Sequence, residues 1–379
     1  MVKLRDDDDS PEPAEKGERL ASLDAMRGLV LLLIVGHGFG LRQMLDPQRW
    51  SWITNQLAQR EWQGCTLWDL LQPAMLFLVG VAMPYSYANR EASGQNWIRQ
   101  FAHAIKRAGL LILLGVYLDS WNAQRLVFDL RGDLQQIGLA YFLAFLVLPL
   151  GMPAQGVTVA FLLIGHTAAH VIHAFAGGHE LWLPDRNVGI AIDQWLHLGP
   201  HSHHYTTFNA VSNAAIVLLG VLIGNVIRGG LTSGAKVAVL AACSVVGLLF
   251  GWFLSGGNGF IELSWVAIIP MIQRLGTWTF VFMAVGWTLL AFTYFYLIID
   301  GFKLISLATP LAVFGRNALF LFIAFSLFRP WAERNALLVL PTEPATIQRL
   351  GPLFVELMIV LTFWLICLWL YCRRIFFKV

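Results

Sequence analysis

Three ionisable residues, Asp24, Arg27 and His37, stand in or beside the first long apolar segment of the chain. A charged side chain in such a segment is costly if the segment crosses a membrane, so it normally faces the interior of a helix bundle and has a partner. The imidazole of His37 can act as a general base. It follows Arg27 by ten residues, close to three helical turns, so one α-helix would place both on roughly the same face.

Asp24 and Arg27 are spaced i, i+3 on one helix face and admit two interpretations. They can shape a polar pathway, or they can be a capping and interfacial ion pair, with Ser22 as the N-cap of the helix. The sequence leaves both open.

A second group of polar and aromatic residues precedes the next apolar segment, with Glu61, Trp62 and Asp69 close together. Aromatic rings and a carboxylate at a membrane boundary can hold a sugar, and Asp69 or Glu61 can support a base. A structural interpretation competes, because Thr66 can N-cap the helix with Asp69 three residues later, as in a capping box. Trp is also an ordinary interfacial anchor.

Later segments contain two amides and a basic cluster. Gln135 opens one apolar segment and Asn317 interrupts another, and buried amides can either contact a substrate or tie helices together. Arg99, Lys106 and Arg107 can meet the phosphates of a nucleotide-like cofactor or serve as a positive-inside anchor.

Metal ligands and disulfides are not indicated. The four cysteines form no CxxC pair. His201, His203 and His204 lie close together, but the neighbouring Pro and Ser favour a loop without the regular spacing of a metal site. We expect no metal.

The whole chain has the composition of a membrane protein: of its 379 residues 57% are hydrophobic and 13% charged, with a mean hydropathy of +0.63. Segments of about 20 apolar residues are long enough to cross the hydrocarbon as helices. We predict an all-α, polytopic integral membrane bundle of about ten transmembrane helices, near residues 23–41, 67–87, 103–118, 134–151, 155–176, 207–227, 234–255, 275–299, 306–327 and 352–372. The net charge of +3 is spread along the chain, so no nucleic-acid partner is expected.

Two regions follow from this pattern: a disordered acidic tail over 1–18 and a ten-helix membrane domain over 19–379. Lys and Arg are more frequent on the side of the termini, with clusters at 99–107 and 373–378, so the positive-inside rule places both termini in the cytoplasm. Three long loops, 42–66, 177–206 and 328–351, are then expected outside.

Five short motifs, in this order, resemble membrane acyltransferases related to heparan-α-glucosaminide N-acetyltransferase, in a bacterial version. They extend over nearly the whole chain and are RLASLDAMRG at 19–28, WQGCTLWDL at 62–70 with Pro73 and Val79-Gly80, LQQIG at 134–138, GRNA at 315–318 and YCRRIFFKV at 371–379. The first segment through His37 is also similar to the opening motif of type 3 acyltransferases, in which a histidine near the outer end of that helix is catalytic.

The resemblance implies that acetyl-CoA is the donor, bound from the cytoplasmic side, and that the acetyl group reaches an amino sugar on the far side of a bacterial inner membrane. In such relatives a histidine three residues before the Trp-x-Gly of the first outer loop carries the chemistry. Gln59 occupies that position here, and Phe325 stands near a second common histidine. An amide cannot take a proton at neutral pH or form an acyl-imidazole, so both departures weaken the catalytic inference.

We therefore predict an acyltransferase that moves an acyl group from cytoplasmic acyl-CoA to a sugar hydroxyl or amine of an envelope glycan. The predicted site comprises His37 as base, supported by Asp69 or Glu61; Asp24, Arg27, Gln59, Trp62, Gln135 and Asn317 along the substrate path; and Arg99, Lys106 and Arg107 at the coenzyme A phosphates. The expected partners are membrane lipids, the glycan acceptor and, in a homodimer, a second copy. Two alternatives remain: a carrier or flippase for a small anionic solute or lipid, and a catalytically silent relative that binds glycan.

Overall fold

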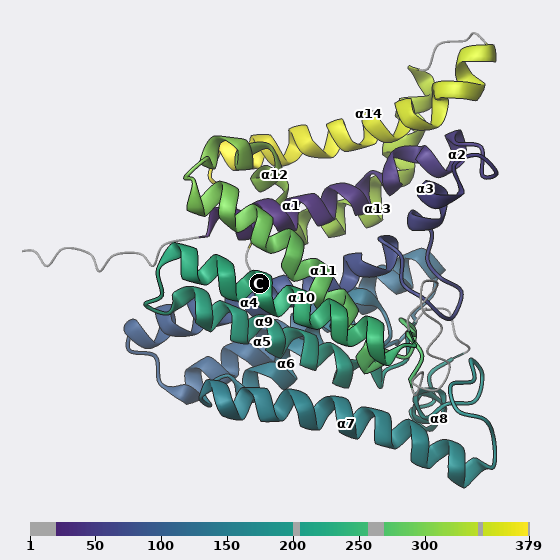
Figure 1. Ribbon diagram of the computed structural model, residues 1–379. Coiled ribbons are helices and arrows are strands. Elements are labelled where there is room, and N and C mark those ends of the chain that lie inside the picture. The colour runs from purple at the N-terminus through teal and green to yellow at the C-terminus, as the bar shows by residue number, and fades with distance from the viewer. Residues whose placement is uncertain (1–19, 200–204, 257–268, 340–343, 378–379) are drawn as a thin grey trace, which may run out of the picture.

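The computed structural model describes residues 20–199, 205–256, 269–339 and 344–377, and within these ranges the chain is helical, with one isolated antiparallel bridge and no strand (Figure 1). The predicted acidic tail, 1–18, lies outside the described residues. The helices are α1 (Ala21–Val35), α2 (Leu41–Met44), α3 (Ser51–Gln56), α4 (Leu71–Ala92), α5 (Trp97–Ala123), α6 (Asp133–Val147), α7 (Met152–Gly177), α8 (Val188–Trp195), α9 (Asn209–Arg228), α10 (Ser233–Leu254), α11 (Trp278–Phe295), α12 (Ile305–Arg316), α13 (Ala318–Leu338) and α14 (Pro344–Cys372). Short turns of other helix types, η1 (His37–Gly40), η2 (Trp68–Leu70) and η3 (Tyr296–Gly301), join some of them.

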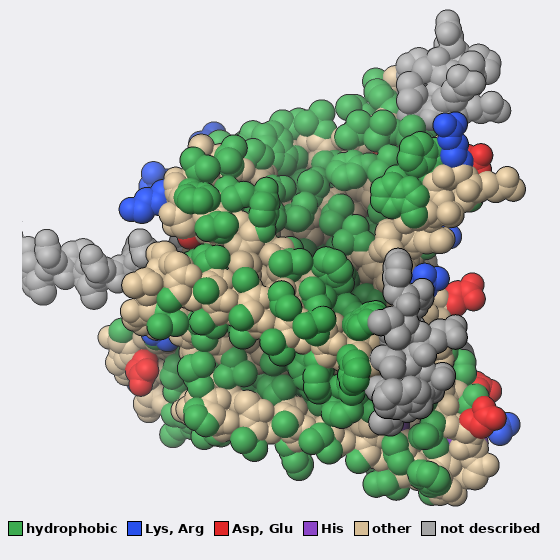
Figure 2. Space-filling view, in the orientation of Figure 1, with side chains coloured by type: hydrophobic (Ala, Val, Ile, Leu, Met, Phe, Trp, Pro, Cys, Tyr) green, Lys and Arg blue, Asp and Glu red, His purple; other side chains and the backbone are tan. Residues whose placement is uncertain are grey.

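Seven of the described helices are long and apolar enough to cross a membrane, and nine spans result if each of two bent helix pairs counts as one. Every predicted apolar segment falls on one helix or, at 306–327, on the bent pair α12 and α13. Because α6 has only 15 residues and falls below the length of a span, a count of ten is not confirmed. Figure 2 shows hydrophobic side chains over the helical body and charged ones mainly near its two ends. Phe161, for example, is 73% exposed. A lipid environment accounts for this apolar exterior, as expected of an integral membrane protein.

The bundle has two ends. The end that carries α2, α3 and α8, at the right of Figure 1, is here called the loop face, and the opposite end, where α1 and α5 begin, is called the base face. Side-chain contacts tie the elements together at each end. At the loop face Trp62 Nε1 donates to the carbonyl of Trp182 at 3.0 Å, and at the base face the backbone N–H of Ser22 donates to Asp300 at 3.2 Å.

Glycines allow two pairs of helices to touch through their backbones. A Cβ on Gly28 of α1 would lie 1.8 Å from the carbonyl oxygen of Leu311 in α12, and one on Gly80 of α4 would lie 2.0 Å from that of Val217 in α9. Only a residue without a side chain fits at such distances, and small residues of this kind allow close packing of membrane helices. The first contact joins the middle of α1 to the second half of α12.

The structure corrects three expectations about the spans. The first helix ends at Val35 and not near 41, because the chain enters a left-handed turn at His37–Gly40. The predicted span 306–327 is bent by 61° between α12 and α13. The predicted outer loop 328–351 is mostly helical, because α13 continues through Pro330 to Leu338 and α14 already begins at Pro344.

The start of α1 also differs from prediction. Leu20 is the N-cap residue and provides no side-chain cap, so Ser22 is not the N-cap. The carboxylate of Asp300 accepts the N–H of Ser22 instead, which supplies from another helix the anionic partner that a helix N-terminus favours.

Candidate functional site

A cavity of about 420 Å³ lies between α1, α4, α5, α6 and the junction of α12 with α13, and is here called the central cavity. Four arginines contribute to its lining: Arg27, Arg90, Arg107 and Arg316. Cationic side chains that line a concave site within a membrane bundle usually serve a ligand or a pathway.

Three of these arginines, Arg90, Arg107 and Arg316, lie toward the base face, and aromatic rings or an acid hold two of them. The guanidinium of Arg107 stands 4.6 Å from the ring centroid of Tyr141, and that of Arg316 stands 4.8 Å from Tyr371. Arg316 Nε also lies 3.5 Å from a carboxylate oxygen of Asp24. Arg107 Nε is buried without a hydrogen-bond partner among the described residues, so the protein does not use this donor itself.

The structure separates the basic cluster predicted at 99–107. Of its three members Arg107 lines the central cavity, whereas Arg99 and Lys106 are exposed on α5. Arg90 and Arg316 were not predicted as site residues. Their sequence signal is a cation in the last turn of an apolar helix, which ordinary membrane anchoring explains equally well.

The middle of the central cavity is mostly apolar, with Arg27 as an exception. The lining there includes Leu31, Met75, Val79 and Ile137. Arg27 Nη2 donates to the carbonyl oxygen of Leu78 at 3.1 Å, so α4 holds this mid-bundle cation in place. The predicted neighbours Asp24 and Arg27 therefore have different roles: Arg27 lines the cavity, and Asp24 is buried beside Arg316.

Gln72 lies at the loop-face end of the central cavity. Its Nε2 atom is buried without a hydrogen-bond partner among the described residues. A buried amide donor without a partner is unusual, because most buried polar groups are hydrogen-bonded. Gln72 was not predicted as a site residue, since a glutamine at the start of a helix carries no signal of its own.

A second cavity of about 230 Å³, here called the polar chamber, adjoins the central cavity and shares Asp133, Leu134 and Phe322 with it. Its other polar lining residues are Asp119, Asn122, Arg131, Gln135, Tyr205 and Ser326. The predicted residue Gln135 lies here, and its Nε2 donates to Asp119 at 2.6 Å and to the carbonyl oxygen of Asp129 at 3.3 Å.

Two residues of the chamber that were not predicted from the sequence, Arg131 and Tyr205, remain protonated at neutral pH. Arg131 is fully buried and forms a bidentate ion pair with Asp129, with Nε 2.8 Å from Oδ1. Burial raises the pKa of Tyr205 well above its usual value, with Asp133 and Asp69 adding to the effect, so its hydroxyl remains protonated at neutral pH. The hydroxyl accepts a hydrogen bond from Gln273 at 2.9 Å and retains its own proton for donation.

His37 lies just beyond the central cavity on the loop-face side. Ile34, three residues before His37, lines the cavity. The imidazole ring of His37 is 6.3 Å from the ring of Trp68, which lies one turn before Gln72. The imidazole is exposed and lies in a strained turn, with φ 42° at His37 and left-handed angles through Gly40. Strain of this kind is concentrated at functional sites.

An ion pair between α13 and α14 supports the surroundings of His37. Arg329 Nη2 lies 2.6 Å from Glu356, and Nη1 donates to the carbonyl oxygen of Val35 at 3.3 Å. The Arg329 guanidinium also packs 5.2 Å from the ring of Phe325, which in turn lies 5.8 Å from His37. Phe325 thus contributes an aromatic wall beside His37.

Asp69 is engaged in the capping box that the sequence suggested. One carboxylate oxygen accepts the backbone N–H of Thr66 at 2.9 Å, and the Asp69 N–H donates back to the Thr66 hydroxyl at 3.4 Å. The other oxygen accepts the N–H of Arg60 at 3.3 Å. The reciprocal hydrogen bonds of the structural interpretation are therefore present, although Leu67 and not Thr66 is the N-cap residue of η2, and Asp69 orders the loop that ends beside His37.

The remaining predicted residues of this loop differ in exposure. Glu61 is exposed, whereas Gln59 and Trp62 are half-buried. Cys65 lies in the same loop, and burial, reinforced by Asp69, raises the pKa of its thiol to about 12. Cys65 is therefore a thiol and not a nucleophilic thiolate at neutral pH.

The amide of Asn317 holds the C-terminal segment. Its Nδ2 donates to the carbonyl oxygen of Ile375 at 3.2 Å, and its Oδ1 accepts the N–H of Phe377 at 3.1 Å. Phe377 thereby reaches the wall of the central cavity. Asn317, expected as a donor along the substrate path, instead positions this wall.

No arrangement of three or more His, Cys, Asp or Glu suited to a metal occurs in the part of the chain that the structure describes. His201, His203 and His204 lie outside that part.

The chain has a distant similarity to a known enzyme. No family model matches the chain. Over 133 residues the chain is 27% identical to heparan-alpha-glucosaminide N-acetyltransferase of the mouse, Mus musculus, and the match covers 33% of this chain and 18% of the mouse protein. The chain thus matches less than a fifth of the length of that relative. This similarity supports a distant acyltransferase-like relationship and agrees in kind with the motif resemblance.

Proposed function

We propose that the protein is an integral-membrane acyltransferase that takes an acyl group from acyl-CoA at the base face and transfers it to a sugar hydroxyl or amine at the loop face. The observation that carries this proposal is the central cavity, in which arginines toward the base face connect through an apolar middle to Gln72 and the polar chamber. The distant similarity to an acetyltransferase supports the same class of reaction.

The distribution of charge suits an acyl-CoA donor. Arginine binds phosphate through paired, charge-assisted hydrogen bonds, and Arg90, Arg107 and Arg316 surround the base-face part of the cavity. The narrower, less polar pantetheine arm would extend along Leu31, Met75 and Val79. The thioester would then reach the level of Gln72. Acetyl-CoA is the proposed donor, with the base face in the cytoplasm of a bacterial inner membrane.

The transfer itself needs a base and an oxyanion donor. His37 would take the proton from the acceptor hydroxyl or amine as its oxygen or nitrogen attacks the thioester carbonyl. The carbonyl oxygen becomes an oxyanion, to which the free Nε2 of Gln72 would donate. When the tetrahedral intermediate collapses, the carbon–sulfur bond breaks and coenzyme A leaves as a thiol with the proton that His37 returns.

The acceptor would occupy the polar chamber. Asp119, Asn122, Gln135, Tyr205 and Ser326 offer both donors and acceptors of hydrogen bonds, as sugar hydroxyls require. Asp69 supports the site by ordering the loop at residues 58–69, in place of the catalytic role that the sequence suggested.

The experiment is coenzyme A release by the purified full-length protein with acetyl-CoA and a panel of simple glycosides. Wild-type turnover is expected, and His37→Ala should reduce it about 10²–10⁴-fold without weakening coenzyme A binding. Gln59→His should change little, because the base is elsewhere. Wild-type protein that binds coenzyme A but never releases it from acetyl-CoA would contradict the proposal and favour a silent relative.

The four arginines of the cavity also fit a carrier for a small anion, and this is the second candidate. A carrier would move a radiolabelled anionic solute across a sealed vesicle without cleaving acetyl-CoA. Uptake of that solute, together with no coenzyme A release, would replace the transferase by the carrier.

A further inference from the structure

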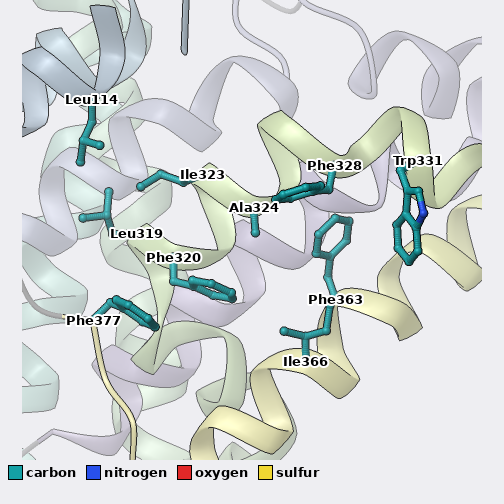
Figure 3. Close-up of a pocket in the computed structure, with 10 residues that line it drawn as sticks. All are labelled: Leu114, Leu319, Phe320, Ile323, Ala324, Phe328, Trp331, Phe363, Ile366 and Phe377. Carbon is teal, nitrogen blue, oxygen red and sulfur yellow. The ribbon is translucent and has the colours of Figure 1, made fainter. Parts of the chain in front are cut away.

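A cavity of about 730 Å³, lined only by hydrocarbon and aromatic side chains, lies between α13, α14, α5 and the C-terminal segment (Figure 3). It is here called the apolar groove, and its lining residues are Leu114, Leu319, Phe320, Ile323, Ala324, Phe328, Trp331, Phe363, Ile366 and Phe377. Its volume is in the range of small-molecule sites, roughly 300–1,000 Å³. The acyl-transfer chemistry proposed above uses none of these side chains.

The groove is open to the surroundings of the bundle. Phe328, Trp331, Ile366 and Phe377 are all exposed, with Trp331 54% accessible. Figure 3 shows Phe377 at one end and Trp331 at the other. Because α13 and α14 are proposed membrane helices, a groove of this chemistry opens onto lipid and not onto water.

The groove has the length of one membrane leaflet. From Phe320 to Trp331, α13 rises by roughly 16 Å at about 1.5 Å per residue. The hydrocarbon core of a bilayer is about 30 Å thick, so the groove matches one half of it. Trp331 stands toward the loop-face end, where an indole suits the boundary between hydrocarbon and headgroups.

The groove and the polar chamber lie on neighbouring faces of the same two helices. On α13, Ile323 and Ala324 line the groove, whereas Phe322 and Ser326 line the chamber. On α5, Leu114 of the groove is followed by Gly115 of the chamber. The groove also shares Leu319 and Phe377 with the central cavity. One molecule with a polar head and a hydrocarbon tail therefore has a matching site for each part.

We propose that the acceptor is a lipid-anchored glycan, whose sugar enters the polar chamber while its hydrocarbon tail lies in the apolar groove. The role of the glycolipid as acceptor rests on the proposed function, whereas the binding of a glycolipid at these two sites does not depend on catalysis. If the acceptor were a water-soluble sugar, only bulk lipid would occupy the groove. The position of the groove beside the chamber would then contribute nothing to acceptor binding.

The binding test uses dodecyl β-glucoside with a diazirine in its chain, presented to the full-length protein in phosphatidylcholine vesicles. Photolysis should label peptides of α13 and α14. A tenfold excess of unlabelled dodecyl glucoside should reduce the labelling several-fold, whereas the same excess of dodecanol or phosphatidylglycerol should not. Equal competition by dodecanol or phosphatidylglycerol would show ordinary lipid in the groove and overturn the proposal, as would the absence of label there.

Two variants fill the groove from different sides. Ile366→Trp adds bulk at its exposed rim on α14, and Ala324→Phe adds bulk on α13. Either should reduce the labelling about tenfold and raise the KM for dodecyl glucosides about tenfold, with no change for methyl glucosides. The matched control is Ala160→Trp, at an exposed position of α7, which should change neither.

The two proposals fail separately. Head-dependent labelling without coenzyme A release for any acceptor would refute the transferase and leave the glycolipid site standing. Turnover that is equal for methyl and dodecyl glycosides and is unaffected by both groove variants would overturn the lipid-anchored acceptor and leave the transferase standing.

Discussion

Asp24 in α1 and Arg316 at the end of α12 form an ion pair, with Oδ2 and Nε 3.5 Å apart, at the point where these two helices touch through Gly28 and Gly315. The carboxylate is buried, while the guanidinium reaches the lining of the central cavity. The close helix contact therefore determines where one of the base-face cations stands.

Replacing Gly28 should destabilise the protein because a Cβ there would lie 1.8 Å from the Leu311 carbonyl oxygen, a backbone atom that cannot move alone. Gly28→Ala is expected to lower stability by about 1–3 kcal/mol, as overpacking does. Thermal unfolding in detergent measures the change. Gly165→Ala in α7 is the control, because a Cβ there meets nothing within 4 Å. Equal melting temperatures for the two variants would contradict the close α1–α12 contact.

Neighbouring cations on α5 should differ in their contribution to donor binding. Arg107 lines the central cavity with a free Nε, whereas Lys106 is exposed elsewhere on the helix. Arg107→Gln should weaken coenzyme A binding about tenfold or more, in line with roughly 1.5–3 kcal/mol for a hydrogen bond to a charged group. Lys106→Gln should leave the affinity near that of the wild type. Calorimetric titration of each variant with coenzyme A measures the affinity. An equal loss of affinity in both variants would contradict a specific role of Arg107 and indicate a diffuse charge effect.

The free amide of Gln72 gives a kinetic prediction. If its Nε2 donates to the oxyanion, Gln72→Leu should lower kcat by about 10²–10³-fold while coenzyme A binding stays unchanged, since such donors act mainly in the transition state. Gln63→Leu is the control, because Gln63 is exposed in the loop before α4. A Gln72→Leu enzyme with normal kcat would show that the amide has no part in the transfer.

The raised pKa of Cys65 predicts its reactivity. Its thiol moves from an ordinary value of 9.0 to about 12, mainly through burial. Since thiolate is the reactive form, the alkylation rate of Cys65 should keep rising up to pH 10 with no inflection near 9. Maleimide labelling followed by mass spectrometry reports each cysteine separately. An inflection near pH 9 would mean that Cys65 is solvated like a free thiol.

Local patterns in the sequence predicted the helices and one detail of the site. Apolar segments long enough to cross a membrane are helical in the structure because a helix satisfies its own backbone hydrogen bonds within the membrane. The Thr66–Asp69 capping box was also foreseeable, because both partners lie three residues apart. The turn at His37–Gly40 was not, although left-handed angles cost little at two of its residues, Gly38 and Gly40.

The cavities could not be predicted from the sequence because they depend on long-range packing. Arg90 and Arg107 come from the consecutive helices α4 and α5, but Arg316 follows about 200 residues later in α12, and no spacing rule connects the three. Tyr205 and Gln135 meet only because α6 packs against the segment before α9. Similarly, Asn317 was expected to serve a substrate, but its partners belong to a segment about 60 residues later.

The central claim is that an acyl group passes from a donor at the base face to an acceptor at the loop face. The most direct measurement uses sealed proteoliposomes of known orientation, with radiolabelled acetyl-CoA on the base side and a dodecyl glycoside in the membrane leaflet of the loop side. We expect labelled acetyl-glycoside in the loop-side leaflet and free coenzyme A on the base side, both lost in His37→Ala. Donor and product confined to the same side, or no acetyl transfer at all, would contradict the account.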